Sequence, residues 1–203
     1  MSRVAHIIGN GRQATMYKPA KGLKITCNVP PMEVDNVYTT TIVDFKMCNA
    51  IHKDGVVVPN DWVCGFRPKK YMEMNPDFHM KFAQKVKEFY LELPPYAGKG
   101  AMGYTNFNCG HFATHWAANK LKCDEIHMYG FDSIFDFDLS SSSDFILNSD
   151  RGTMNNARLT ANWRPIWEGL FREFTNCQFV MYHKHDAIKI DIPKNVEIRT
   201  SNR

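Results

Sequence analysis

An apolar run at residues 4–8 stops abruptly at Gly9, Asn10 and Gly11. This pattern is typical of a buried strand that ends in a turn of exposed backbone N–H groups. Glycine has no Cβ and tolerates positive φ, so the main chain of such a turn can approach a ligand closely. Placed before a helix start, the turn can hold a phosphate, although an ordinary tight turn gives the same pattern. The feature therefore predicts a first strand whose carboxyl end carries either a phosphate-binding turn or a plain one.

The composition is that of one soluble globular domain. The chain has 203 residues, of which 44% are hydrophobic and 23% charged, so it can bury a substantial core. A net charge of +4 suits an anionic ligand such as a nucleotide or nucleotide sugar and does not require nucleic acid. No apolar stretch is long enough to span a bilayer, and no signal-peptide pattern opens the chain. Six cysteines without a Cys-x-x-Cys pair predict reduced thiols, so we expect a cytoplasmic protein.

Two further β-type runs also end in polar residues. Residues 23–27 end at Asn28, and the β-branched run 39–43 ends at Asp44. Because the carboxyl ends of parallel strands meet at one edge of a sheet, we expect these two side chains to converge with Asn10 on one crevice.

The rest of the chain alternates extended and helical patterns. We expect an irregular basic segment at 62–71, and a long flexible loop at 133–156 that is rich in Ser, Asp and Asn. The other expected elements are strands at 56–58, 125–129 and 178–182, helices at 76–93, 111–122 and 157–174 (with Pro165 inside the last), and an edge strand within 188–199. This alternation predicts an α/β fold with one doubly wound, mainly parallel sheet flanked by helices, and a single domain over residues 1–203.

Two stretches carry a resemblance to a known family. The first is Ile7-Ile-Gly-Asn-Gly11 followed by Ile25-Thr-Cys-Asn28, and the second is Asn108-Cys-Gly110, a helix, and Asp124-Glu-Ile-His-Met-Tyr-Gly-Phe-Asp132. In this order and spacing they resemble the bacterial sialyltransferases that use CMP-activated sugars. They are also similar to a broader Rossmann-like group that includes archaeal pterin diphosphokinases. The resemblance covers roughly residues 4–30 and 105–132.

The resemblance implies a nucleotide-sugar site, with a CMP-sugar as the favoured donor and no metal. Its expected members, which follow the strand ends and open the internal helix, are Gly9, Asn10, Gly11, Asn28, Asp44, Asn108, Cys109 and Gly110. Asp44 stands where those enzymes tend to have Asn. Cys109 stands where they have Ser, which removes a strong hydroxyl donor. A helix start at Gly110 suits an anion independently of the resemblance.

The catalytic residue is where the chain departs from that family. The sialyltransferases carry their catalytic His after the strand that ends Gly-Phe-Asp, whereas residues 133–165 here contain no His. His183 and His185 end a later strand at the same expected edge, and an imidazole there can deprotonate an acceptor hydroxyl near neutral pH. Asp132 is a weaker candidate for the base. A solvated turn is the alternative explanation for the two histidines.

Metal binding has two further candidate sets. His111 and His115 lie four apart on one helix, but no carboxylate lies between them as in His-Glu-x-x-His, so packing or helix capping explains them more simply. Asp132, Asp136 and Asp138 can gather a divalent ion, and an acidic loop explains them equally well.

Three functions remain open from the sequence. The first is a nucleotide-sugar-dependent glycosyltransferase that acts on an acceptor hydroxyl. The second is a non-catalytic nucleotide-binding module of the same fold. The third is a Mg²⁺-dependent diphosphokinase-like enzyme, with Asp44 or Asp132 near the metal. A homo-oligomer is compatible with each, and the acceptor is not indicated.

Overall fold

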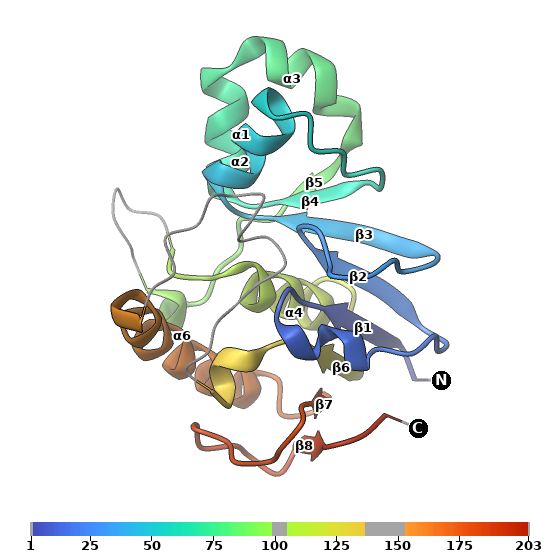
Figure 1. The fold of residues 1–203 in the computed structure, drawn as a ribbon, viewed down its shortest axis with the longest axis vertical. Coiled ribbons are helices and arrows are strands. Elements are labelled where there is room, and N and C mark those ends of the chain that lie inside the picture. Colours follow the sequence, from blue (N-terminus) through green and yellow to red (C-terminus); the bar gives the residue numbers. More distant parts are fainter. Residues whose placement is uncertain (1, 99–104, 137–152, 203) are drawn as a thin grey trace.

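The computed structural model describes residues 2–98, 105–136 and 153–202. Its strands are β1 (Val4–Ile8), β2 (Leu23–Cys27), β3 (Val37–Ile42), β4 (Trp62–Cys64), β5 (Val86–Phe89), β6 (Glu125–Tyr129), β7 (Gln178–Tyr182) and β8 (Val196–Arg199). They form one eight-stranded sheet in the order β5-β4-β3-β2-β1-β6-β7-β8, in which every neighbouring pair is parallel (Figure 1). This is the α/β, Rossmann-like doubly wound sheet that the sequence predicts.

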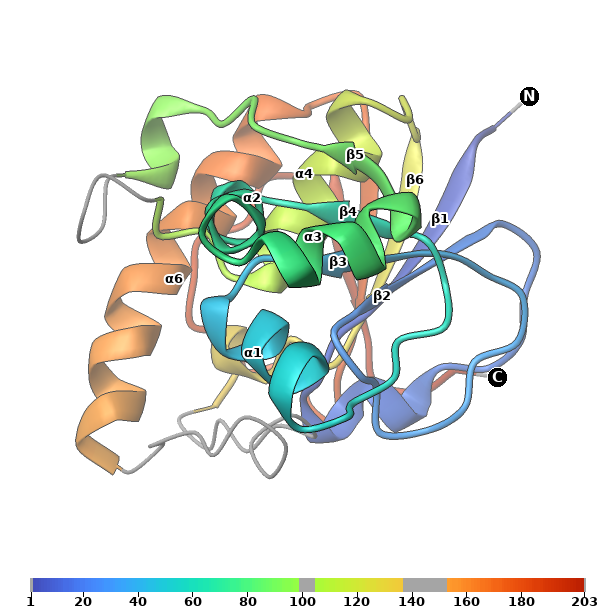
Figure 2. The ribbon, with the colours of Figure 1, turned by 90° about the horizontal axis from the view of Figure 1, so that it is seen from above.

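Helices cover both faces of this sheet. The α-helices are α1 (Phe45–Lys53), α2 (Phe66–Met74), α3 (Pro76–Phe82), α4 (Cys109–Asn119) and α6 (Thr153–Glu173). Short 3-10 helices are η1 (Arg12–Met16), η2 (Ala83–Lys85), η3 (Pro95–Ala97) and η5 (Asp132–Ile134). In β4, Val63 packs into the core formed with α4 and α6, whereas Trp62 and Cys64 pack into the core formed with α1, α2 and α3. Successive strand residues point to opposite faces, so these helix groups lie on opposite sides, as Figure 2 shows for α1 and α4.

The chain order reverses at β1, which has β2 on one side and β6 on the other. Ligands in open α/β sheets bind outside the carboxyl ends of the strands at such a switch point. The turns after β1 and β6 therefore lie where the fold favours a site.

Two expected elements near β4 are wrong. Residues 56–58 form no strand, and the segment 62–71, expected to be irregular, contains β4 and most of α2. Trp62 and Val63 are fully buried beside β3, with Trp62 opposite Thr40. A three-residue strand buried on both faces shows no alternation, which is why the sequence pattern misses it.

The helix expected through Leu93 ends at Phe82, and its second half is wrong. A short 3-10 helix and then β5 follow it. Phe78 and Phe82 on α3 and Val86 and Phe89 on β5 pack into the same core, so two different elements together produce the helical spacing.

The tail is extended over a shorter range than expected. Only Val196–Arg199 forms a strand, parallel to β7. Ile188, Ile190 and Ile192 alternate with charged residues but pack against the core as part of the connection from β7 to β8. A parallel neighbour requires such a crossover, so those residues cannot continue β7 as a hairpin.

Other expectations hold. Helix α6 contains Pro165. All six cysteines are buried and free, as expected for reduced thiols. Most of the expected 133–156 loop, including Asp138, lies outside the described residues. Among the residues that the structure describes, no helix is long and apolar enough to cross a membrane.

Candidate functional site at the carboxyl edge of the sheet

The turns that follow β1 and β6 are joined by their backbones. Gly9 N–H donates to the Tyr129 carbonyl at 2.8 Å, and Gly11 N–H donates to the Gly130 carbonyl at 3.0 Å. Arg12 N–H donates to Asp132 Oδ2 at 2.9 Å. These three N–H groups are the ones that a phosphate-binding turn would offer. In this arrangement they hold the two turns together instead.

The Asn10 side chain ties the end of β1 to the end of β2. Its Nδ2 donates to the carbonyls of Cys27, at 2.7 Å, and Val29, at 2.9 Å. Its Oδ1 lies 3.5 Å from Nδ2 of Asn28, which has a φ of 51°, a conformation that Asn tolerates better than most residues. Of the three strand-end side chains that the sequence predicts to converge on one crevice, Asn10 and Asn28 therefore lie in contact.

Asn108 begins α4 with a reciprocal cap. Its Oδ1 accepts from the His111 N–H at 2.9 Å, and the His111 Nδ1 accepts from the Asn108 N–H at 3.1 Å. The cap leaves the first N–H groups of the helix, those of Cys109 and Gly110, at the carboxyl edge of the sheet. The helix start thus keeps the polarity that favours an anion.

The Cys109 thiol is buried below that helix start. Its sulfur lies 3.1 Å from the Thr41 hydroxyl and donates to the Thr41 carbonyl at 3.0 Å. Burial raises its pKa well above the usual value, and the nearby charge of Asp44 adds to this rise. Asp44 itself is half-buried between β3 and α1. The thiol therefore stays protonated and contributes packing rather than a nucleophile.

The ring of Phe131 lies against two of the predicted glycines. A Cβ added to Gly110 would lie 2.3 Å from Phe131 Cε1, and one added to Gly9 would lie 3.1 Å from the same atom. The ring also contacts Trp167 edge-on, with ring centroids 5.3 Å apart. The two halves of the predicted nucleotide site, the turn after β1 and the start of α4, therefore face each other across the Phe131 ring.

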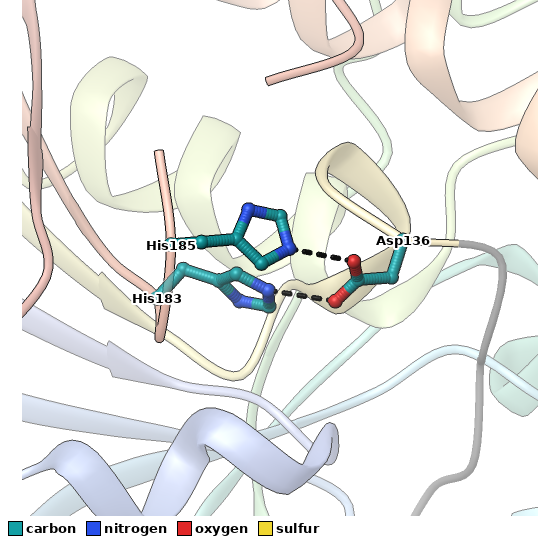
Figure 3. A group of neighbouring side chains, drawn as sticks. All are labelled: Asp136, His183 and His185. Atoms are coloured by element: carbon teal, nitrogen blue, oxygen red, sulfur yellow. Dashed lines mark hydrogen bonds and ion pairs between the residues drawn. The ribbon is translucent and has the colours of Figure 1, made fainter. Parts of the chain in front are cut away.

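Beside this edge, His183 and His185 share one carboxylate (Figure 3). His183 Nε2 lies 2.8 Å from Asp136 Oδ2, and His185 Nε2 lies 2.7 Å from Asp136 Oδ1. The His183 side chain is 1% exposed and stacks on Phe135 at 4.0 Å, whereas the His185 side chain is 33% exposed. His185 is thus the imidazole of this pair that a substrate can reach.

Asp132 lies behind the pair and links it to the β1 turn. Its Oδ2 accepts from Arg12 N–H, while its Oδ1 lies 3.7 Å from His183 Nδ1. Both Oδ1 and Nδ1 are buried without a hydrogen-bond partner. Burial raises the pKa of Asp132 to about 6, and burial lowers the pKa of His183 despite the adjacent Asp136. Burial alone would raise the pKa of Asp136, but the hydrogen bonds from both imidazoles leave it below its usual value.

The structure thus brings three sequence-predicted residues, Asp132, His183 and His185, into one cluster. Sequence reasoning considered Asp136 only as an acidic-loop metal ligand and missed its contact with the histidines. The Asp136 N–H donates to the Asp132 carbonyl at 2.8 Å. The four-residue spacing of the two aspartates is therefore the feature of the sequence that indicates their proximity.

His111 and His115 are held in structural contacts. His111 Nε2 lies 3.1 Å from the Trp163 carbonyl, and His115 bridges Tyr90 and Glu173. In the part of the chain that the structure describes, the group close enough to share a metal ion is Asp136, His183 and His185.

The fold and this edge define an α/β protein with a Rossmann-like sheet and an acid–imidazole cluster beside its switch point, after β6 and β7. Comparisons with protein-family models, curated proteins and solved structures give no match to the chain.

Proposed function

We propose that the protein is a nucleotide-sugar-dependent glycosyltransferase that transfers a sugar, from a CMP-sugar by preference, to an acceptor hydroxyl. One observation carries the proposal. Asp132 bonds to the backbone of the β1 turn through Oδ2 and faces His183 through Oδ1, so the switch-point edge and the acid–imidazole cluster are contiguous. A donor bound at that edge has its reacting carbon beside groups that can move a proton.

The proposed donor site spans the β1 turn and the start of α4. Asn10 and Asn28 shape its floor, and the N–H groups of Cys109 and Gly110 face the leaving phosphate, where helix polarity stabilises negative charge. Phe131 lies between the two halves, so donor binding requires its ring to stack on the nucleotide or to turn away. The net charge of +4 favours an anionic donor.

In the proposed reaction the acceptor oxygen attacks the anomeric carbon while the bond from that carbon to the nucleotide phosphate breaks. The acceptor proton passes to His185, and the nucleotide leaves with the bonding electrons. His185 Nε2–H donates to Asp136, so the lone pair lies on Nδ1, which now accepts from the Ala187 N–H at 3.1 Å. Ala187 is exposed, so its N–H can turn to water when the acceptor binds.

The second candidate, a non-catalytic nucleotide-binding module, has its own support. Three N–H groups of the β1 turn already donate to acceptors within the protein, and the Phe131 ring lies against Gly9 and Gly110. Donor turnover is what separates the two candidates. The Mg²⁺-dependent diphosphokinase has less support, because the cluster beside Asp132 is rich in nitrogen donors, which Mg²⁺ does not prefer.

The test combines nucleotide binding with donor turnover. We expect CMP or a CMP-sugar to raise the melting temperature of the wild-type protein, because it binds the folded state alone. Asn10→Ala should weaken that binding at least tenfold in calorimetry, because it frees the end of β2. His185→Ala should keep the affinity but slow donor hydrolysis or transfer by about 10²-fold or more.

Asn195→Ala is the matched control. Asn195 Nδ2 also donates to backbone carbonyls, those of Phe171, Phe174 and Cys177, and the residue precedes β8 at the opposite edge of the sheet. It should lose stability as Asn10→Ala does and keep nucleotide affinity. Absence of binding to any CMP, UDP or GDP compound contradicts the proposal, and binding without turnover in wild type favours the non-catalytic module.

A further inference from the structure

We propose that Asp136, His183 and His185 bind a divalent transition-metal ion. The three side chains come from two neighbouring segments: Asp136 follows η5 after β6, and both histidines follow β7. One ligand atom from each lies within 4.8 Å of the others. Figure 3 shows both imidazoles directed at the two oxygens of one carboxylate, so a single ion can replace the two protons between them.

Two orphaned buried atoms give an independent argument. In the ion-free arrangement His183 donates from Nε2 to Asp136, which leaves a bare Nδ1 facing Asp132 Oδ1 at 3.7 Å. Both atoms are buried and lack a hydrogen-bond partner, and the Asp132 residue is only 7% exposed. Leaving two such atoms unpaired is costly. The ion-free cluster is therefore incomplete on its buried side.

An ion on His183 Nε2 resolves that defect. The ring proton then lies on Nδ1 and faces Asp132 Oδ1 across 3.7 Å, so a small approach of the two groups makes the hydrogen bond that both orphaned atoms lack. A metal-bound histidine that donates its other N–H to a carboxylate is the usual arrangement in metal sites. Phe135, stacked on His183 at 4.0 Å and 6°, fixes the ring plane for this role.

His185 needs one adjustment. Its Nδ1 accepts from the exposed Ala187 N–H, so binding through Nε2 requires Nδ1 to become the donor and that contact to open. Lys184, whose Nζ lies 4.0 Å from Asp136 Oδ2, is 59% exposed and can turn to solvent. Arg164 Nη2 lies 3.3 Å from the Asp136 carbonyl, on the main chain of that ligand residue.

The donor set defines the class of ion. Two imidazoles and one carboxylate suit Zn²⁺, Co²⁺, Ni²⁺, Fe²⁺ or Mn²⁺, whereas Mg²⁺ and Ca²⁺ prefer oxygen. Three protein ligands leave coordination positions for water or a substrate oxygen, which is typical of catalytic sites. The resemblance to the sialyltransferases implies no metal, so a bound ion would depart from that expectation. Asp136, His183 and His185 would bind the ion whatever reaction the protein performs. With the ion bound, the ion would acidify an acceptor hydroxyl in place of His185.

The experiment titrates the chelator-treated 203-residue chain with Zn²⁺ by calorimetry and with Co²⁺ by visible absorption, in the absence of nucleotides. We expect one ion per chain, displaced by EDTA, and no binding of Mg²⁺. Asp136→Asn and His185→Gln should each weaken Zn²⁺ binding at least tenfold. Asp132→Asn should weaken it by about 10- to 100-fold through the orientation of His183.

His52→Gln is the matched control. His52 is also held by a carboxylate, with Nε2 at 2.7 Å from Asp77, but it lies outside the cluster and should leave Zn²⁺ affinity unchanged. His185 is partly exposed, so its variant should fold, and circular dichroism verifies this. No Zn²⁺ binding to wild type overturns the inference, as does binding that survives both Asp136→Asn and His185→Gln. Neither outcome bears on nucleotide binding, so this inference and the proposed function fail separately.

Discussion

At the scale of single residues, glycines mark the places where two turns touch. A Cβ on Gly11 would lie 2.6 Å from the Gly130 carbonyl and 2.7 Å from the Asp132 carboxyl. Gly9 and Gly110 both make room for the Phe131 ring. Gly9 and Gly11 indicate that the main chain after β1 closely approaches a ligand or another part of the protein. The sequence does not show that a neighbouring turn and an aromatic ring already occupy that place.

Gly110→Ala tests this contact. The new methyl meets the Phe131 ring and should destabilise the fold by about 1–2 kcal/mol, because overpacking costs about 1–3 kcal/mol and the helix propensity of Ala returns up to about 1 kcal/mol. In a Phe131→Ala background the same change should be neutral or stabilising. Urea denaturation of the four proteins of this cycle measures the coupling. Equal effects in both backgrounds would show that the ring is not the obstacle.

At the scale of elements, helix α6 holds the cluster from outside. Arg164 Nε donates to the Ser133 carbonyl at 2.8 Å, and its Nη2 lies 3.3 Å from the Asp136 carbonyl. Pro165 follows directly, inside the helix and exposed. A proline there removes one helical hydrogen bond and clashes with the preceding turn.

Pro165→Ala should therefore raise the free energy of unfolding by about 1–3 kcal/mol, because interior proline costs about 3 kcal/mol and the helix has partly adapted to it. Guanidinium denaturation measures the gain. Asn162→Ala, at an exposed position in the same turn, should raise it by no more than about 0.7 kcal/mol. A loss of stability in Pro165→Ala would mean that the proline is needed to place Arg164 over η5.

How far the sequence predicts these elements depends on where each strand lies. β1, β2, β6 and β7 lie inside the sheet, and their buried apolar residues and the polar residues that follow them are visible in the chain. β4, β5 and β8 are short or lie near an edge, and Val86 and Phe89 fit a helical period as well as a strand.

Whether the residues of the candidate site can be predicted also depends on the strands that they follow. His183, His185 and Asp132 could be grouped in advance, because they follow neighbouring central strands. The bridging role of Asp136 could not, since it depends on the path of the chain after β6. The Phe131 contact depends on packing between turns that are distant in sequence, which no local pattern records.

At the scale of the whole molecule, buried imidazoles set the response to acid. Burial lowers the pKa of His6, of His115 and of His111, for which it falls to about 3. His111 illustrates the cause: its Nδ1 accepts from Asn108 N–H, so a proton on that atom would break the cap of α4. The folded state therefore resists protons that the unfolded chain accepts near its ordinary histidine pKa of about 6.5.

The sign of the pH dependence follows directly. The stability that these histidines contribute is complete above about pH 7 and falls as the pH drops below about 6.5, by about 1.4 kcal/mol per pH unit for each histidine that only the unfolded state protonates. Asp132, whose pKa is raised to about 6 by burial, acts in the opposite direction below that pH. For His111 this window extends down to about pH 3. Urea denaturation across this range should show the loss, and His111→Gln should make the slope shallower. An unchanged slope in His111→Gln would contradict the role assigned to it.

The six buried, free cysteines make it possible to measure how often each region of the fold opens locally. Each thiol is buried and inaccessible to reagents, so its rate of alkylation depends on how often the structure around it opens. The six lie in or beside different elements, namely Cys27 (β2), Cys48 (α1), Cys64 (β4), Cys109 (α4), Cys123 (before β6) and Cys177 (before β7). Mass spectrometry of timed labelling can therefore rank the regions of the sheet by the ease with which they open. The proposed site has its own reporter in Cys109, so a ligand that closes this edge should slow one thiol more than the other five.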